Sequence, residues 1–224
     1  MNGPLAGRVA LVTGAGRGIG RATAALLVAD GATVLAVART AAELESLAAE
    51  TGAEWVAADL AEPADCVRAV AEAERRLGRI DILVNNAGVG SAGERPVWEQ
   101  DPSRWRQALA LNLDAPFELT RLAVPGMIER RSGRIVMVAS LAALPAGVVP
   151  GMSAYVVSKH GLLGLMRAVA VEVAPFGVTC NAVLPGSVRT ETAERKVAEE
   201  AERAGGTVEQ AWAARASTPT ASRC

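Results

Sequence analysis

The residues with the clearest chemical potential are a tyrosine and a lysine four positions apart, Tyr155 and Lys159. Tyr155 is the only tyrosine of the chain, and Lys159 is one of two lysines among many arginines. Residues four apart on a helix leave it on the same face, so both side chains can reach one bound molecule. A free phenol ionises only near pH ~10, and an adjacent ammonium favours the phenolate. The spacing therefore predicts a proton-transfer pair in which Lys159 tunes Tyr155.

A glycine-rich segment, Thr13 to Gly20, follows an apolar run and precedes a helical pattern. In this position Gly14, Gly18 and Gly20 let the backbone approach a pyrophosphate, which would meet unpaired N–H groups and the positive end of the helix dipole. A tight turn without a ligand is the alternative interpretation of the glycines alone. The flanking strand and helix favour the phosphate site.

The second predicted strand ends at Ala38 and is followed by Arg39, where an acid would accept hydrogen bonds from a ribose 2′-hydroxyl. Arg39 can instead pair with a 2′-phosphate, and Arg17 of the glycine turn can reach the same group. We therefore expect NADP(H) to be preferred over NAD(H), with solvated strand-end arginines as the alternative. Asp59, followed by Leu60, either meets the adenine amino group or caps the next helix.

Apolar runs alternate with helical patterns along most of the chain. The runs lack polar alternation, as expected of strands that are buried on both faces of a parallel sheet. We predict one α/β domain, a doubly wound Rossmann-type parallel sheet of six strands flanked by helices. The predicted strands are Val9 to Thr13, Thr33 to Ala38, Glu54 to Ala58, Ile80 to Val84, Arg134 to Ser140 and Val178 to Leu184. The predicted helices include Ile19 to Asp30, Ala64 to Leu77, Trp105 to Glu129 and Ser153 to Ala174.

The composition argues against several classes of protein. The 224 residues carry a net charge of −1 without a long basic or acidic run, so we expect no nucleic-acid partner. No apolar run reaches the roughly 18 residues of a membrane span, and the N-terminus has no signal-peptide pattern, so a cytoplasmic protein is expected. The three cysteines lack metal-ligand spacing, and we predict no metal site.

Five motifs occur in the order and approximate spacing of the short-chain dehydrogenase/reductase family, which the chain resembles over roughly residues 5–192. Each motif alone could arise by chance, but together they are specific. They are Thr13-Gly14-xxx-Gly18-x-Gly20, Asn85-Asn86-Ala87-Gly88, Ser140, Tyr155-xxx-Lys159 and Pro185-Gly186-x-Val188-x-Thr190.

The resemblance implies hydride transfer between NADP(H) and a carbonyl or secondary alcohol. In the family, the matching tyrosine gives or takes the proton of the substrate oxygen, and the matching lysine also binds the nicotinamide ribose. By the same resemblance Ser140 hydrogen-bonds the substrate oxygen, with a turn cap as the alternative. Asn112 holds a water in the proton relay to the lysine, with satisfaction of helix backbone groups as the alternative. The only histidine, His160, is expected to point away from this face and to pack.

The resemblance extends the cofactor site to later strands. The turn Asn86-Ala87-Gly88 resembles the segment that borders the riboses, and the loop from Pro185 to Thr190 resembles the segment that contacts the nicotinamide carboxamide. The expected catalytic residues are Asn112, Ser140, Tyr155 and Lys159. The expected cofactor-binding residues are Gly14, Arg17, Gly18, Ile19, Gly20, Arg39, Asp59, Leu60, Asn86, Ala87, Gly88, Tyr155, Lys159, Pro185, Gly186, Val188 and Thr190.

The C-terminal part departs from the family pattern, in which a further helix and a seventh strand follow. We expect residues 1–192 to form the Rossmann-type dinucleotide-binding and catalytic domain, residues 193–215 a substrate-side helical segment of the same domain, and residues 216–224 a disordered tail. Without a seventh strand, the sixth becomes a sheet edge with apolar side chains exposed. We expect a homodimer through the helices that contain Asn112 and Tyr155, and leave a tetramer open.

The charged segment from Val188 to Trp212 resembles the substrate lid of bacterial 3-ketoacyl and polyketide ketoreductases, which indicates a β-keto substrate. The leading hypothesis is an oxidoreductase for small-molecule carbonyls or alcohols, with Tyr155 as general acid and base. The alternative is a catalytically impaired family member that binds cofactor and serves as a binding or regulatory protein. Tight cofactor binding without turnover would favour the alternative.

Overall fold

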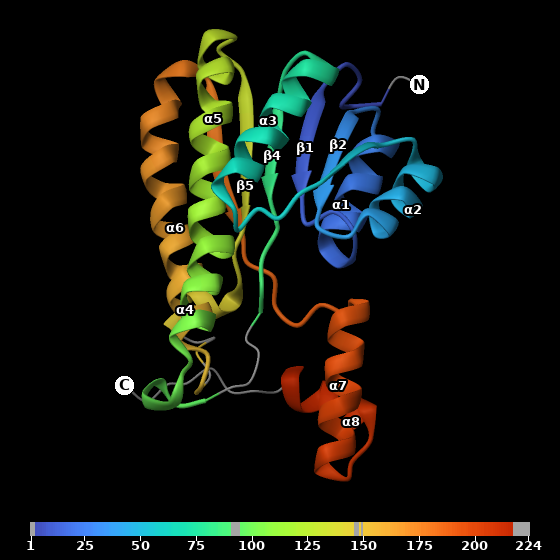
Figure 1. Cartoon of the computed structure of the whole chain (residues 1–224), viewed down its shortest axis with the longest axis vertical. Coiled ribbons are helices and arrows are strands. Elements are labelled where there is room, and N and C mark those ends of the chain that lie inside the picture. The colour runs from blue at the N-terminus through green and yellow to red at the C-terminus, as the bar shows by residue number, and fades with distance from the viewer. Residues whose placement is uncertain (1–2, 91–94, 146–147, 149, 217–224) are drawn as a thin grey trace.

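The structure, a computed structural model, describes residues 3–90, 95–145, 148 and 150–216 (Figure 1). Six parallel strands form one sheet in the order β3-β2-β1-β4-β5-β6, which confirms the predicted doubly wound fold. The strand order reverses between β1 and β4, and ligands of such sheets bind at the carboxyl ends of the strands beside this point. The strands are β1 (Val9–Thr13), β2 (Thr33–Ala38), β3 (Glu54–Ala57), β4 (Ile82–Asn85), β5 (Gly133–Val138) and β6 (Val178–Val183).

Helices cover the two faces of the sheet in separate layers (Figure 1). On one face, α1 and α2 contribute Ala24 and Leu44 to an apolar cluster with β1 and β2. On the other face, α3, α5 and α6 contribute Cys66, Leu119 and Leu162 to a larger cluster. The sheet is therefore buried on both sides over its central strands, as the unbroken apolar runs predict. The helices are α1 (Gly18–Ala29), α2 (Ala41–Thr51), α3 (Pro63–Leu77), α4 (Pro102–Leu109), α5 (Ala115–Glu129), α6 (Ser153–Val173), α7 (Glu191–Ala204) and α8 (Val208–Ala216).

The segment predicted as one helix from Trp105 to Glu129 is interrupted by a π-helical turn, Ala110–Asp114. In this turn the N–H of Ala115 donates to the carbonyl of Ala110, five residues back. Pro116 has no N–H, so it cannot make the α-helical bond to the carbonyl of Asn112. The widened turn places Asn112 at the boundary between α4 and α5, and such turns are frequent at functional sites.

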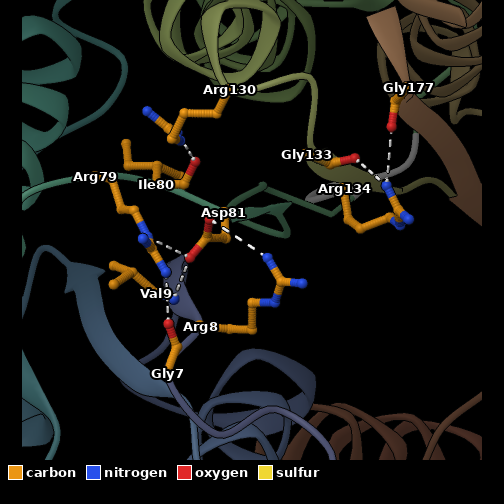
Figure 2. A network of polar contacts seen from close by, with 10 residues as sticks. All are labelled: Gly7, Arg8, Val9, Arg79, Ile80, Asp81, Arg130, Gly133, Arg134 and Gly177. Atoms are coloured by element: carbon orange, nitrogen blue, oxygen red, sulfur yellow. Dashed lines mark hydrogen bonds and ion pairs between the residues drawn. The ribbon is translucent and has the colours of Figure 1, made fainter.

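The amino end of the sheet, opposite the strand ends that carry the sequence motifs, is held by a buried carboxylate and several arginines (Figure 2). Asp81 is only 4% exposed and accepts hydrogen bonds from the backbone of Val9 and from Arg79, both at 2.9 Å. Arg130 donates to the carbonyl of Ile80 at 2.8 Å. These bonds tie β1 and the end of α5 to the segment before β4, which begins at Ile82, two residues later than predicted.

The two edge strands of the sheet differ in how they meet solvent. Along β3, the guanidinium groups of Arg68 and Arg76 donate to the carbonyls of Ala57 and Trp55, at 2.9 and 3.2 Å. Along β6 no strand of the described chain pairs with the outer side, and Val183 is 53% exposed. The prediction that the sixth strand forms a sheet edge with exposed apolar side chains is therefore confirmed.

The two helices α7 and α8 form an antiparallel pair beyond the carboxyl end of the sheet (Figure 1). Thr190 caps α7 by accepting a hydrogen bond from the N–H of Ala193, and Gly205, with φ of 65°, ends the helix. The guanidinium of Arg189 lies 4.9 Å from the ring centre of Trp212, which joins α8 to the loop after β6. The predicted tail lies, apart from its first residue, outside the described residues.

The described residues contain neither a membrane-spanning helix nor a cluster of metal ligands. None of their helices is long and apolar enough to cross a membrane. None of their His, Cys, Asp and Glu side chains form a group of three that could hold a metal ion.

Candidate active site

The carboxyl ends of β1 and β4 are joined by the buried hydroxyl of Thr13. Its Oγ1 donates to the carbonyl of Val84 at 3.1 Å and accepts from the N–H groups of Asn86 and Ala87 at 2.9 and 3.0 Å. One side chain thereby fixes the turn after β4 relative to the end of β1. Thr13 belongs to the glycine motif, but its hydroxyl had no predicted role.

The glycine turn is packed against this second turn through positions where side chains do not fit. Gly14 has φ of 64°, and a Cβ on it would lie 2.7 Å from Nδ2 of Asn86 and 2.9 Å from Cα of Ala87. A Cβ on Gly20 would lie 2.2 Å from the carbonyl oxygen of Gly14. The α1 helix begins at Gly18, and no side chain caps its first N–H groups. These donors and the helix dipole are suited to bind an anion at the surface of the turn.

Charged side chains from three segments lie around the end of β2. Arg39 is exposed directly after the strand, and Arg17 is exposed in the glycine turn. The carboxylate of Glu43, on α2, lies 3.9 Å from the guanidinium of Arg17 and against the backbone of Gly16. A role of Arg17 and Arg39 toward a 2′-phosphate stays a prediction. Glu43 was not expected here, because no motif marks an acid in the first turn of α2.

Asp59 and Leu60 lie at the carboxyl end of β3, where the sequence placed them. Oδ1 of Asp59 accepts a hydrogen bond from the N–H of Ala61 at 3.2 Å, and its own N–H donates to Asp65 at 2.7 Å. Leu60 is buried. The carboxylate of Asp59 therefore closes the turn before α3 and does not cap this helix, whose N-cap residue is Glu62, so the capping alternative is not supported. Its contact with an adenine amino group stays a prediction.

Tyr155 and Lys159 lie on one face of α6, beside the end of β5. Lys159 Nζ is 5.9 Å from the centre of the Tyr155 ring and donates to the carbonyl of Val138 at 2.8 Å. The lysine is 5% exposed, and this burial lowers the pKa of its ammonium from 10.5 to about 8. The pair therefore combines a phenol with an ammonium that can lose its proton in the neutral to mildly alkaline range.

Ser140 follows the end of β5 by two residues and is partly exposed. Its Oγ accepts a hydrogen bond from the N–H of Ala142 at 3.1 Å, so the side chain does cap the short turn Leu141–Ala143. A hydroxyl that accepts one bond still has its proton to donate. The capping role and a role toward a substrate oxygen are compatible.

Asn112 is fully buried and uses all of its side-chain donors. Oδ1 accepts from the N–H of Val89 at 2.8 Å, and Nδ2 donates to the carbonyl of Val89 and to Oγ of Ser158, both at 3.0 Å. The partners lie after β4 and on α6, so the alternative that Asn112 satisfies its own helix backbone is wrong. The side chain joins both segments to the π-helical turn.

The comparisons with known proteins agree with this geometry. The model of the short chain dehydrogenase family matches residues 8–201 of the chain. The chain belongs to the short-chain dehydrogenase family.

Relatives and solved structures of the family cover most of the chain. The D-beta-hydroxybutyrate dehydrogenase of Cupriavidus necator is 39% identical over 92% of this chain and 81% of that protein. A putative ketoacyl reductase of the monensin polyketide synthase, from Streptomyces virginiae, is 42% identical over 84% of this chain and 73% of that protein. A metagenomic short-chain oxidoreductase in complex with NADP superposes with a TM-score of 0.77, at 40% identity, over 83% of this chain and 85% of that one. The family and these names place the chain among the dehydrogenases and reductases.

The loop from Pro185 to Thr190 bridges the two halves of this short-chain dehydrogenase site. The carbonyl of Pro185 accepts a hydrogen bond from the N–H of Leu141 at 3.1 Å, next to Ser140. At its other end, the side chain of Thr190 lies 3.4 Å from where a Cβ on Gly18 would be. Gly186 and Val188 lie between these contacts in the chain. The loop therefore runs from the turn after β5 to the start of α1, and its contact with a nicotinamide carboxamide stays a prediction.

His160 does not pack in the core of the short-chain dehydrogenase fold as predicted. It is exposed on α6, and its Nδ1 lies 2.9 Å from the carbonyl of Val156, one turn earlier. One position beyond Lys159, the ring points away from the site, because consecutive helix residues diverge by about 100°.

A hollow of about 600 Å³ lies along the outer edge of β3, apart from the residues expected to be catalytic. It is lined by Ala48, Trp55, Arg68 and Arg76, among others.

Proposed function

We propose that this chain is an NADP(H)-dependent oxidoreductase that interconverts a carbonyl and a secondary alcohol, with Tyr155 as general acid and base. The observation that carries the proposal is the pairing of Tyr155 with a buried Lys159 on one face of α6. Burial of an ammonium is costly, so it is retained where it has a use, and perturbed pKa values concentrate at functional sites.

The glycine turn, Thr13 to Gly20, and the turn Asn86-Ala87-Gly88 lie at the ends of β1 and β4, and we call them together the cradle. The cradle fits a dinucleotide. The close approach of Gly14 and Gly20 to the neighbouring backbone leaves a flat turn, and the uncapped N–H groups of α1 face the position of a phosphate. Asn86, Ala87 and the loop from Pro185 to Thr190 line the same edge of the sheet. When bound, the nicotinamide cofactor supplies or accepts the hydride.

Side chains of the protein transfer the proton. In carbonyl reduction, the phenol of Tyr155 donates its proton to the substrate oxygen as the substrate carbon gains the hydride. The hydroxyl of Ser140 donates a hydrogen bond to the same oxygen and stabilises the charge that develops there. The ammonium of Lys159 stabilises the phenolate that remains. In alcohol oxidation, the phenolate of Tyr155 takes the proton back.

Preference for NADP(H) rests on charge at the end of β2. Arg39 and Arg17 are both exposed there, and guanidinium groups bind phosphates in a bidentate manner. Glu43, 3.9 Å from Arg17, is the opposing charge that a 2′-phosphate must outcompete. A solved relative with a TM-score of 0.77 is described as a complex with NADP, which supports the assignment.

The names of the relatives favour a substrate in which the carbonyl lies β to a carboxyl group. One relative is named a D-beta-hydroxybutyrate dehydrogenase, which gives the oxygen this position, and another is named a putative ketoacyl reductase. The α7–α8 pair follows the loop after β6 and contacts it through Trp212 and Arg189, which is compatible with a substrate lid. We therefore place 3-oxo acids and 3-oxoacyl thioesters, with the corresponding 3-hydroxy compounds, first among the candidates.

A homodimer through α5 and α6 is the assembly we propose. These helices carry exposed apolar side chains, with Phe117 47%, Val157 44% and Val171 77% exposed. A second copy of the chain would bury them in a self-complementary contact. Sedimentation of the wild type as a dimer, and of Val171→Glu as a monomer, is the expected result; a monomeric wild type would refute it.

The experiment that tests the function is a titration with NADPH and NADH, followed by nicotinamide fluorescence and then by turnover on a panel of 3-oxo compounds. We expect tighter binding of NADPH and reduction of at least one member of the panel. Arg39→Asp should reverse the cofactor preference, and unchanged selectivity would refute the role of Arg39. Tight NADPH binding with no turnover on any ketone or alcohol would support the alternative, a cofactor-binding protein without catalysis.

A further inference from the structure

Ser158 lies between the two residues of α6 that are assigned to proton transfer, and its side chain is fully buried. The hydroxyl donates to the backbone carbonyl of Tyr155 at 2.8 Å and accepts Nδ2 of Asn112 at 3.0 Å. We propose that Ser158 is a positioning residue, which holds Asn112 and the π-helical turn against the Tyr155–Lys159 face of α6. Its effect on turnover rests on the proposed function, while its effect on Lys159 does not.

A purely local role is the competing explanation. Helical serines often bond to the carbonyl three or four residues back, and such a bond needs no partner elsewhere. Ser158 differs because its oxygen also accepts a hydrogen bond from another helical segment, 46 positions away in sequence. The hydroxyl donates its single proton to the carbonyl of Tyr155, and one of its lone pairs accepts the bond from Asn112. The hydroxyl therefore connects two parts of the site.

The carboxamide of Asn112 depends on this connection. Val89 takes the oxygen and one N–H of the amide, and Ser158 takes the second N–H. Without the hydroxyl, a buried N–H would lose its partner, and the amide would be free to tilt in search of another. Ser158 therefore completes the set of bonds that fixes the orientation of Asn112.

The orientation of Asn112 matters to Lys159 because both reach the space beside Gly88. A Cβ on Gly88 would lie 2.9 Å from Oδ1 of Asn112 and 3.5 Å from Nζ of Lys159. An amide oxygen directed into this space favours the ammonium of Lys159, whereas a tilted amide favours it less. Since burial already lowers the pKa of this ammonium to about 8, a small change in its surroundings moves it across the working range of pH.

The first test observes Lys159 without a substrate. The chain has two lysines, so protein labelled with ¹³C at lysine Cε gives two signals, and Lys196→Arg identifies the other one. We expect Ser158→Ala to lower the titration midpoint of Lys159 by a few tenths of a pH unit. Asn112→Ala should lower it at least as much, and the double variant should add nothing.

A matched control separates positioning from loss of a buried hydrogen bond. Thr120 and Asn85 form another buried hydroxyl–amide pair, with Nδ2 of Asn85 3.3 Å from Oγ1 of Thr120. Thr120→Val should lower the thermal midpoint, as Ser158→Ala does, but leave the titration of Lys159 unchanged. If Ser158→Ala does not fold, Ser158→Cys replaces it in every comparison. The cysteine keeps a side chain at this position but forms weaker hydrogen bonds.

The second test is turnover. Ser158→Ala should lower kcat about tenfold with KM and the Kd of NADPH within about twofold, and in the Asn112→Ala background it should change kcat little. Identical titration of Lys159 in wild type and Ser158→Ala, or equal fold losses of kcat in both backgrounds, would overturn the proposal. A shifted Lys159 titration in a protein that turns over no carbonyl would support the role of Ser158 and refute the proposed function instead.

Discussion

The two halves of the site use different parts of the polypeptide. Around β1 and β4, the surface is made by backbone groups and by missing side chains, as at Gly14 and Gly20, where a Cβ would meet neighbouring atoms at 2.7 and 2.2 Å. Along β5 and α6, the groups to which we assign catalysis are the ends of the side chains of Ser140, Tyr155 and Lys159. Adding atoms to the glycine turn should weaken cofactor binding, whereas removing atoms from a catalytic side chain should lower turnover. Substitutions in the two halves should therefore fail in distinguishable ways.

The largest effect is expected from Tyr155→Phe. The change removes one oxygen from a partly exposed ring and leaves the glycine turn untouched, so kcat should fall by about 10²–10⁴-fold with NADPH affinity within a few fold. Steady-state turnover measures kcat, and fluorescence titration of the same sample measures the affinity for NADPH. Because Tyr155 is the only tyrosine, loss of the tyrosine absorbance confirms the variant. Retained turnover would show that another group moves the proton.

Added bulk in the cradle should give the opposite pattern. Gly14→Ala places a methyl group 2.7 Å from Asn86 Nδ2, so NADPH affinity should fall by at least about tenfold. Gly52→Ala is the matched control, because Gly52 also has positive φ, 76°, but a Cβ there meets nothing within 4 Å. Both variants carry similar backbone strain and should lower the thermal midpoint, but only Gly14→Ala should weaken cofactor binding. Equal binding by the two would contradict a close-packed cradle.

The buried lysine should appear in the pH dependence of stability. Its pKa is lowered to about 8 in the folded protein from 10.5, so between these values the unfolded chain binds more protons. Stability therefore rises with pH from about 8 to 10.5, on the order of 3 kcal/mol in total. Lys159→Met should lack this rise, while Lys196→Met should retain it. Denaturant unfolding at pH 7, 8.5 and 10 measures the difference, and parallel curves for wild type and Lys159→Met would refute the burial argument.

The smallest effect is expected at the charge cluster beside β2. Glu43→Gln removes the negative charge 3.9 Å from Arg17, so NADPH should bind about two- to threefold tighter at low salt, while NADH affinity stays constant. Glu45→Gln, on the same helix but exposed, should change neither affinity. A gain that persists undiminished at high salt would argue against an electrostatic cause.

The features that follow a regular spacing along the chain could be predicted from the sequence. The six strands, the strand–turn–helix at Gly14 to Gly20, and the shared face of Tyr155 and Lys159 follow from apolar runs and helical spacing, and the structure agrees within one or two residues at most strand ends. These features are local, so a linear pattern records them.

What the sequence did not predict depends on contacts between distant segments. The buried bonds of Asn112 to Val89 and Ser158, and the carboxylate of Glu43 against the glycine turn, join residues that no spacing rule relates. Pro116 could have indicated the π-helical turn, because its missing N–H leaves the carbonyl of Asn112 without an α-helical donor. His160 was expected to pack, but the outer face of α6 at that position meets solvent.

The unequal edges of the sheet limit how many chains can join through their strands. Edge-to-edge pairing needs free backbone groups, and at β3 the carbonyls of Trp55 and Ala57 are already bound by Arg76 and Arg68. β6 is the other edge strand, and no strand of the described chain pairs with its outer side. A molecule with one open edge can close a two-fold pair but cannot extend it, so the two arginines of α3 act as a stop against filament growth.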